Sequence, residues 1–279
     1  MACASGRFKN SRDRIERAAD HARAFTVEWD AIFDKHSPVP SFAKDKYSGW
    51  FILSASIAPE IKERIQRNIL SLELGELAYQ LRAALDGLIW DAVTYSQGSE
   101  PPSNEANGLE FPILNGKKRG FKQCGLHKFP FPQKLKDWLE SIQPDATEKA
   151  IGDPHRGLKA TLEDIHNLAR MDRHRRLRVI AAVPVLAKLV IETDPPGGII
   201  SDRIFSPCDL LSGQDEIARI RVECAGGLVP YNVRLKAQVA FDISVEDVEL
   251  YDGKNISFQL ERFLQAVMRV TERFSEEFP

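Results

Sequence analysis

The chain has 279 residues, of which 43% are hydrophobic and 28% are charged. This composition is that of a globular protein, and the length suits one large domain or two small ones. Lys and Arg together number 38 against 40 Asp and Glu, so the formal net charge is −2. The balance excludes a protein drawn to nucleic acid or to an anionic membrane by a global positive field, and any such contact must come from a local patch.

The spacing of apolar residues in the first two thirds of the chain predicts mainly helices. Residues 8–36 carry apolar side chains at helical spacing and end before two prolines. Residues 47–58 are rich in aromatic and apolar side chains and predict a strand. A second long helix is expected over 60–96, where Leu and Ala recur every three or four residues. A short helix at 134–141 and a third substantial helix at 154–177 follow.

The periodicity changes after the third helix. Residues 219–224 and 233–243 alternate polar and apolar side chains, which favours antiparallel strands with one packed face. Residues 179–193 add one or two more strands, and a last amphipathic helix ends the sequence. The predicted fold is α+β: a bundle of long antiparallel helices, a C-terminal antiparallel β-sheet and a closing C-terminal helix.

We divide the chain into three parts on this basis. Residues 1–177 are mainly helical, with one strand near 47–58. Residues 178–255 form the antiparallel β region, and residues 256–279 form a helix that packs back on the bundle. We expect the parts to make one compact unit.

Targeting and redox signals point to the cytoplasm. The first 14 residues lack the apolar core of a secretory signal, and the longest apolar stretch, residues 50–59, is too short to cross a bilayer. The four cysteines have neither zinc-binding nor redox spacing. We expect a cytoplasmic protein with reduced thiols and no membrane contact.

One cation falls on a helix face that should be buried. On a helical wheel of the second long helix, Arg82 lies inside the leucine arc and Asp86 follows one turn later. On the third long helix, Asp172 continues the apolar stripe. A buried charge is tolerated only when it is paired, so we predict that Arg82 meets Asp86 or Asp172 between the two helices. The acidic and amide residues on the far side of the second helix should be solvated, and these are Glu73, Glu76, Gln80 and Asp91.

Two interpretations of these charges stay open. In the first, a buried ion pair fixes how the helices pack. In the second, the charges line a polar cleft with Arg82, Asp86 and His174 as catalytic residues. The binding residues of that cleft would be Tyr79, Asp172, Arg173, Arg175 and Arg176.

Five arginines and His174 lie within residues 170–178. Such a cluster could bind phosphate groups, although cations at a helix C-terminus also complement the helix dipole, and we favour the second explanation. His166, Arg170 and His174 share one helical stripe, but no carboxylate on it completes a metal site, so we expect none. The motifs of nucleotide-binding loops, serine hydrolases and zinc proteases are missing, and no cofactor is expected.

Five short motifs follow one another between residues 75 and 175. They are Gly75-Glu76, Leu81-Arg82-Ala83-Ala84-Leu85-Asp86, Phe111-Pro112-Ile113, Gln143-Pro144 and Asp172-Arg173-His174-Arg175. In this pattern the chain resembles a group of bacterial and phage-borne proteins that carries no established activity.

That group is in turn similar to the HEPN superfamily, helical domains of which many are metal-independent RNases. The resemblance implies an Arg and a His from paired helices in one cleft, typically across a dimer. Here Gly87 stands where the group often has His, and Tyr79 stands at another position where His is frequent. His174 is then the residue left for acid–base chemistry beside Arg82.

Three functions remain in competition, and whether the protein is an enzyme stays open. The favoured one is a non-catalytic interaction or scaffold protein of a bacterial or mobile-element system. The alternative is a HEPN-like metal-independent RNase or RNA-binding protein in phage or mobile-element conflict. The third is a small-molecule pocket between helices and sheet. The expected partner is a protein or RNA, and the long terminal helices could pair in a homodimer.

Overall fold

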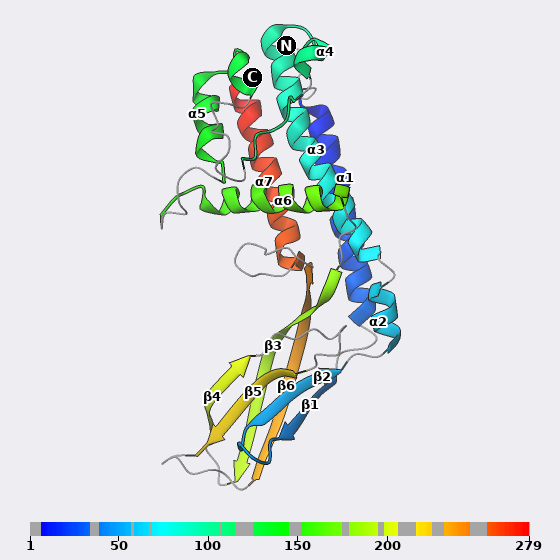
Figure 1. The fold of residues 1–279 in the computed structure, drawn as a ribbon, viewed down its shortest axis with the longest axis vertical. Coiled ribbons are helices and arrows are strands. Elements are labelled where there is room, and N and C mark those ends of the chain that lie inside the picture. Colours follow the sequence, from blue (N-terminus) through cyan, green and yellow to red (C-terminus); the bar gives the residue numbers. More distant parts are fainter. Residues whose placement is uncertain are drawn as a thin grey trace.

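Three long helices form one end of the molecule. The computed structural model places α1 (Lys9–Phe33) against α3 (Ile69–Gln97) and α7 (Ile256–Glu277), both of which run antiparallel to α1 (Figure 1). The structure describes residues 7–33, 39–56, 59–66, 69–106, 108–114, 125–144, 152–174, 179–194, 198–205, 216–224, 232–245 and 256–278. The fold is α+β, as the sequence predicts.

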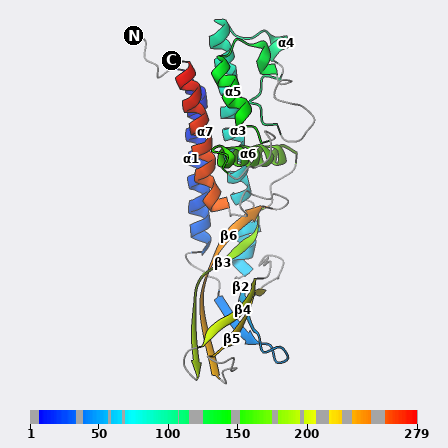
Figure 2. The same cartoon turned by 90° about the vertical axis from the view of Figure 1, so that its left-hand side faces the viewer.

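Shorter helices surround this bundle. The α6 helix crosses α3 on the side away from α1, as the two views in Figures 1 and 2 show together. The short helix α5 lies beside the upper part of α7 (Figure 1). The remaining bounds are α2 (Pro59–Gln66), α4 (Ser103–Ala106), the 3-10 turn η3 (Gly125–Lys128), α5 (Gln133–Ser141) and α6 (Arg156–His174). None of the described helices is both long enough and apolar enough to span a bilayer.

The helix α3 is buried on nearly every side. Its leucine face packs against the core, and α1 covers the opposite face, which we expected to be solvated. There the Arg14 guanidinium donates to the Gln80 side-chain oxygen over 3.2 Å, and His21 Nδ1 lies 2.7 Å from Glu73 Oε2. The prediction of a solvated far side is therefore wrong for Gln80, because a second helix supplies partners for its polar groups.

The strands form the other end of the molecule. Four of them make an antiparallel sheet in the order β1-β2-β5-β4, and the other two pair as a long antiparallel ribbon. The bounds are β1 (Val39–Lys44), β2 (Phe51–Ser56), β3 (Val179–Asp194), β4 (Ile199–Phe205), β5 (Glu216–Glu223) and β6 (Asn232–Val245). In β5 the side chains alternate as predicted, with Ile220 and Val222 buried and Arg219 and Arg221 exposed.

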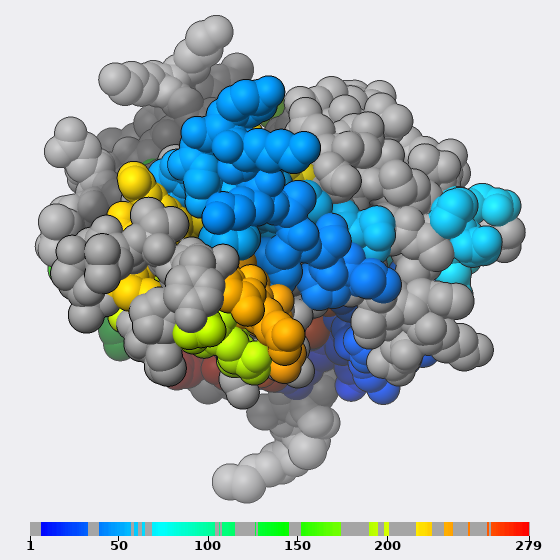
Figure 3. All heavy atoms as spheres, turned by 90° about the horizontal axis from the view of Figure 1, so that it is seen from below, coloured from blue at the N-terminus to red at the C-terminus, as the bar shows by residue number. Residues whose placement is uncertain are grey.

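The β part of the chain is larger than the sequence suggested. Of residues 47–58, predicted as one strand, residues 51–56 form β2, which pairs with the preceding strand β1 in a hairpin. The intervening turn is held by Asp45, whose carboxylate accepts bonds from the Tyr47 N–H and the Ser48 hydroxyl. The hairpin covers much of the lower end of the molecule (blue in Figure 3). Because β2 pairs with β5, residues 39–56 belong with the C-terminal strands and not with the helices.

Other boundaries also differ from the prediction. The strand β4 was missed, and β3 is one strand with two register shifts where two strands were considered. The helix expected over 60–96 is described as two helices, α2 and α3. The molecule is elongated, with helices at one end and strands at the other (Figures 1 and 2). Cys224 is buried, and the other three cysteines lie outside the described residues.

Candidate functional site

Arg82 is the most deeply buried charged side chain of α3. It is only 3% exposed, although the surrounding positions of the helix are apolar. Its Nη2 atom lies 2.9 Å from Asp86 Oδ1 and 3.5 Å from Glu110 Oε2, and it donates a hydrogen bond of 3.0 Å to the Phe111 carbonyl. The predicted ion pair between Arg82 and Asp86 is therefore present, one helical turn apart.

The carboxylate of Asp86 also binds Phe111, which belongs to the segment of residues 109–114 that crosses α3. The Phe111 N–H donates to Asp86 Oδ1 over 2.9 Å. Both backbone polar groups of Phe111 are thus satisfied by one ion pair on α3, in the way that a neighbouring strand would satisfy them. We call Arg82, Asp86 and the Phe111 backbone the polar clamp.

The segment held by the polar clamp is fastened again three residues later. The Leu114 N–H donates to the Gln143 side-chain oxygen over 3.1 Å, and the Gln143 amide nitrogen donates to the Leu139 carbonyl of α5 over 2.8 Å. Phe111 and Ile113 point their side chains into the core between these two attachments. The segment therefore joins α3 to the end of α5.

Burial of the Asp86 carboxyl and the nearby charge of Arg82 shift the pKa of Asp86 in opposite directions. Burial raises the pKa of the Asp86 carboxyl, while the Arg82 charge and the hydrogen bond from Phe111 act in the opposite direction. Arg82 itself has one nitrogen left over, since its buried Nη1 has no hydrogen-bond partner in the described chain. A buried guanidinium nitrogen without a partner is unusual and costs stability.

His166 of α6 completes the surroundings of Arg82. Burial first, and then the positive charges of Arg82, Arg170 and Arg173, together lower the pKa of His166 to about 4, against a smaller opposing effect of Glu110. The imidazole is therefore neutral at pH 7. We did not select His166 from the sequence as a site residue, although its helical stripe with Arg170 was visible there.

Asp172 does not join the polar clamp, contrary to one of the two predicted pairings. It is exposed, and it lies against Gly75, two turns before Arg82 on α3. A Cβ atom at Gly75 would clash with Asp172 Oδ1, so the glycine permits this approach. Burial and the nearby Glu76 raise the pKa of Asp172. Because α6 crosses α3 at a steep angle, its residues reach different turns of α3 (Figure 1).

The other predicted site residues are only partly brought together. Tyr79 is 44% exposed, and no described hydrogen bond or ion pair joins it to the polar clamp. Arg173 is exposed, but its charge acts on both Asp86 and His166, so it lies near them. His174 ends α6, and its side chain lies outside the described residues, as do Arg175 and Arg176.

Gly87 packs close to the neighbouring helix α1. A Cβ atom there would lie 3.1 Å from the Ser11 hydroxyl of α1. That hydroxyl is buried and donates to the Ala84 carbonyl over 3.0 Å. Position 87 thus faces α1, and a Cβ atom there would require the Ser11 hydroxyl to shift by a few tenths of an ångström.

Comparisons with known proteins found no match to this chain. No family model, no curated protein and no solved structure matches the chain. Among the described residues, no group of three or more His, Cys, Asp or Glu is placed to hold a metal ion.

Replacing Gly87 by His should destabilise the fold. The imidazole would have to displace α1 near Ser11, and overpacking of this kind costs about 1–3 kcal/mol. Urea unfolding followed by circular dichroism would measure the loss. The control is Leu72→His at an exposed position of the same helix, which should change the unfolding free energy by no more than about 0.5 kcal/mol. Equal effects of the two changes would contradict the packing described here.

The stability should depend on pH through His166. Its folded pKa is about 4 against an ordinary value of 6.5, so between these pH values the unfolded chain binds a proton that the folded chain does not. The unfolding free energy should therefore rise as the pH rises from about 4 to 6.5, while the raised pKa of Asp86 acts in the opposite sense. Urea unfolding at several pH values would show this slope, and His166→Gln should flatten it. A variant that keeps the wild-type slope would assign the dependence to other groups.

Proposed function

We propose that this chain is a non-catalytic interaction or scaffold protein in which the polar clamp serves the architecture. The observation that carries the proposal is that Arg82 and Asp86 both bind the backbone of Phe111. Charges that are engaged by the chain itself are not presented to a substrate. Their role on this proposal is to fix where residues 109–114 cross α3.

The positions of the shared motifs support the same proposal. Gly75 of the first motif contacts Asp172 of the last, the polar clamp joins the second motif to the third, and Gln143 of the fourth binds Leu114. Each motif therefore has a partner that holds helices or crossing segments together. We also propose that the scaffold works in a bacterial or mobile-element system, on the ground of the resemblance to bacterial and phage-borne proteins.

Removing the cation tests the architectural role. Arg82→Ala should lower the unfolding free energy by about 3–5 kcal/mol, because it leaves the Asp86 carboxylate and the Phe111 carbonyl without their buried partner. The double change Arg82→Ala/Asp86→Ala should cost less than the sum of the single changes, since the two side chains act as one unit. Thermal and urea unfolding of the four proteins would give this coupling.

The matched control for this test is Arg170→Ala, which removes an exposed arginine of α6 near the same cluster. It should leave the melting curve almost unchanged. An Arg82→Ala protein that unfolds like the wild type would exclude the architectural role.

A second candidate function is favoured by His166. A neutral imidazole on α6 lies in the field of a buried cation on α3, and the exposed Arg170 and Arg173 stand beside it. In a metal-independent RNase, such a histidine would take the proton of a ribose 2′-hydroxyl and the arginines would bind the phosphate. His166 would then have the acid–base role that was predicted for His174. This alternative matches the RNase or RNA-binding role that the HEPN-like resemblance implies.

Cleavage of RNA in EDTA separates the two candidates. An RNase should cut a labelled RNA without metal, and His166→Ala should abolish the cutting while circular dichroism shows a folded protein. Arg170→Ala should weaken it, because a phosphate contact is lost. Fluorescence anisotropy with the same RNA would detect binding without cleavage. Intact and unbound RNA in the presence of folded wild-type protein would exclude this candidate and leave the scaffold proposal.

A further inference from the structure

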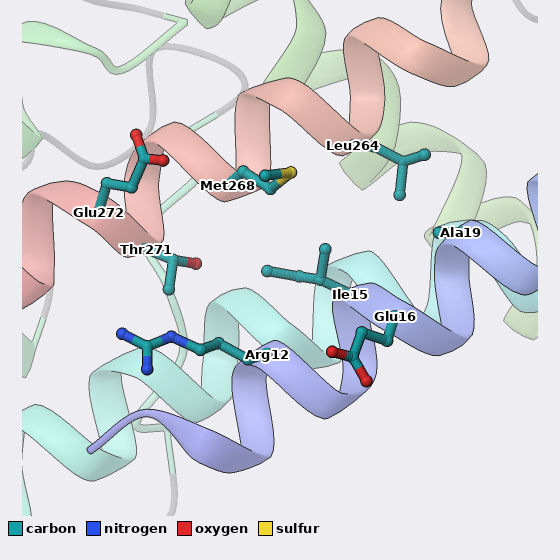
Figure 4. A pocket seen from close by; sticks show the side chains of 8 residues that line it. All are labelled: Arg12, Ile15, Glu16, Ala19, Leu264, Met268, Thr271 and Glu272. Atoms are coloured by element: carbon teal, nitrogen blue, oxygen red, sulfur yellow. The ribbon is translucent and has the colours of Figure 1, made fainter. Parts of the chain in front are cut away.

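A groove runs between α1 and α7 on the side of the bundle away from α6. Its volume is about 360 Å³, and its floor and walls are formed by apolar side chains, chiefly Ile15 of α1 with Leu264 and Met268 of α7 (Figure 4). Met268 is 47% exposed although it is a large hydrophobic residue. The remaining lining residues are Arg12, Glu16, Ala19, Thr271 and Glu272.

The groove continues toward the C-terminal end of α7. A second hollow shares Arg12, Thr271 and Glu272 with the first and adds Ser275 and Glu276. Together the two hollows follow α7 from residue 264 to residue 276, which is about 18 Å at 1.5 Å per helical residue. A length of three helical turns suits a third helix laid along α1 and α7.

Some charged side chains that line the groove have partners in the described chain, and others have none. Glu16 on α1 and Glu272 on α7 stand on opposite sides of the apolar floor, and neither makes an ion pair in the described chain (Figure 4). Glu276 is paired with Arg273, and Arg12 donates to the Ser275 hydroxyl over 3.3 Å. The two free carboxylates therefore favour an occupant with cations on both flanks of an apolar stripe.

A second copy of the chain fits this face less well. Besides Glu272, the exposed side of α7 carries Glu261, Glu276 and one cation, Arg269, so that carboxylates outnumber cations there. A copy that placed its own α7 against the groove would bring these carboxylates toward one another, and like charges at an interface are unfavourable. The charge pattern therefore selects a partner of opposite charge.

We propose that the groove between α1 and α7 binds a basic amphipathic helix of a partner protein. Apolar side chains of that helix would lie on Ile15, Leu264 and Met268, and Lys or Arg on its two flanks would pair with Glu16 and Glu272. The proposal rests on the scaffold function proposed above and names the kind of partner that the scaffold takes.

The probe for this site is a fluorescent 14-residue peptide of Leu, Ala and Lys, with leucines at helical spacing and lysines on both sides. It should bind the full-length protein in a fluorescence anisotropy titration. Met268→Glu should weaken binding at least tenfold, because it places a charge on the apolar floor. Glu16→Lys/Glu272→Lys should also weaken it at least tenfold and remove most of its dependence on salt.

Matched controls make the test specific. Leu72→Glu changes an exposed leucine of α3, and Glu100→Lys/Glu140→Lys makes the same change in net charge at exposed positions elsewhere. Both should bind the peptide like the wild type, and a peptide with Glu in place of Lys should not bind. Circular dichroism of each variant would exclude unfolding as the cause of a loss.

Three outcomes would overturn the proposal. The first is peptide binding that the groove variants leave unchanged, and the second is equal binding of the basic and acidic peptides. The third is a wild-type dimer, seen by light scattering, that Met268→Glu converts to a monomer, since a second copy would then occupy the groove. None of these outcomes bears on the Arg82→Ala stability test, so the groove and the architectural role of the polar clamp can fail separately.

Discussion

The arrangement of the helical end depends on one buried cation. Arg82 lies in the apolar face of α3, where an unpaired charge would be very costly. Its partners come from its own helix and from the Phe111 backbone, so the charge is stable only when residues 109–114 cross α3 at this turn. The same hydrogen bonds to the Phe111 backbone position the Phe111 side chain in the core. The need to pair the buried charge of Arg82 thus fixes the position of residues 109–114, which carry apolar side chains into the core.

The burial of most of α3 limits the surfaces that remain for partners, although Leu72, Glu76, Tyr79 and Tyr95 stay exposed. With α1 on one side and α6 on another, several polar side chains of α3 are used within the bundle, as Arg14 with Gln80 and His21 with Glu73 illustrate. Much of the remaining surface of the bundle is built by α1 and α7. Their outer faces keep an apolar groove with free carboxylates on its flanks, which is the surface that an interaction protein would need.

Helical periodicity predicted the long helices and the burial of Arg82, because a face of leucines defines which side of a helix is packed. The partner of Arg82 was predicted only as one of two carboxylates, since a wheel does not give the angle at which α6 crosses α3. The strands β1 and β4 were missed because short edge strands carry little alternation. His166 was missed because its pKa depends on burial and on arginines of two helices, which no local pattern reveals.

The two candidate functions make different demands on the same guanidinium. Its Nη2 atom is engaged by Asp86 and Phe111, and its Nη1 atom is free of partners in the described chain but buried. A phosphate could bind Nη1 only if the atoms that bury it moved to admit it. The scaffold proposal needs no such movement, because its contacts are already made. An RNase would need an opening motion near His166, and the stability that Arg82 contributes to the closed arrangement would oppose that motion.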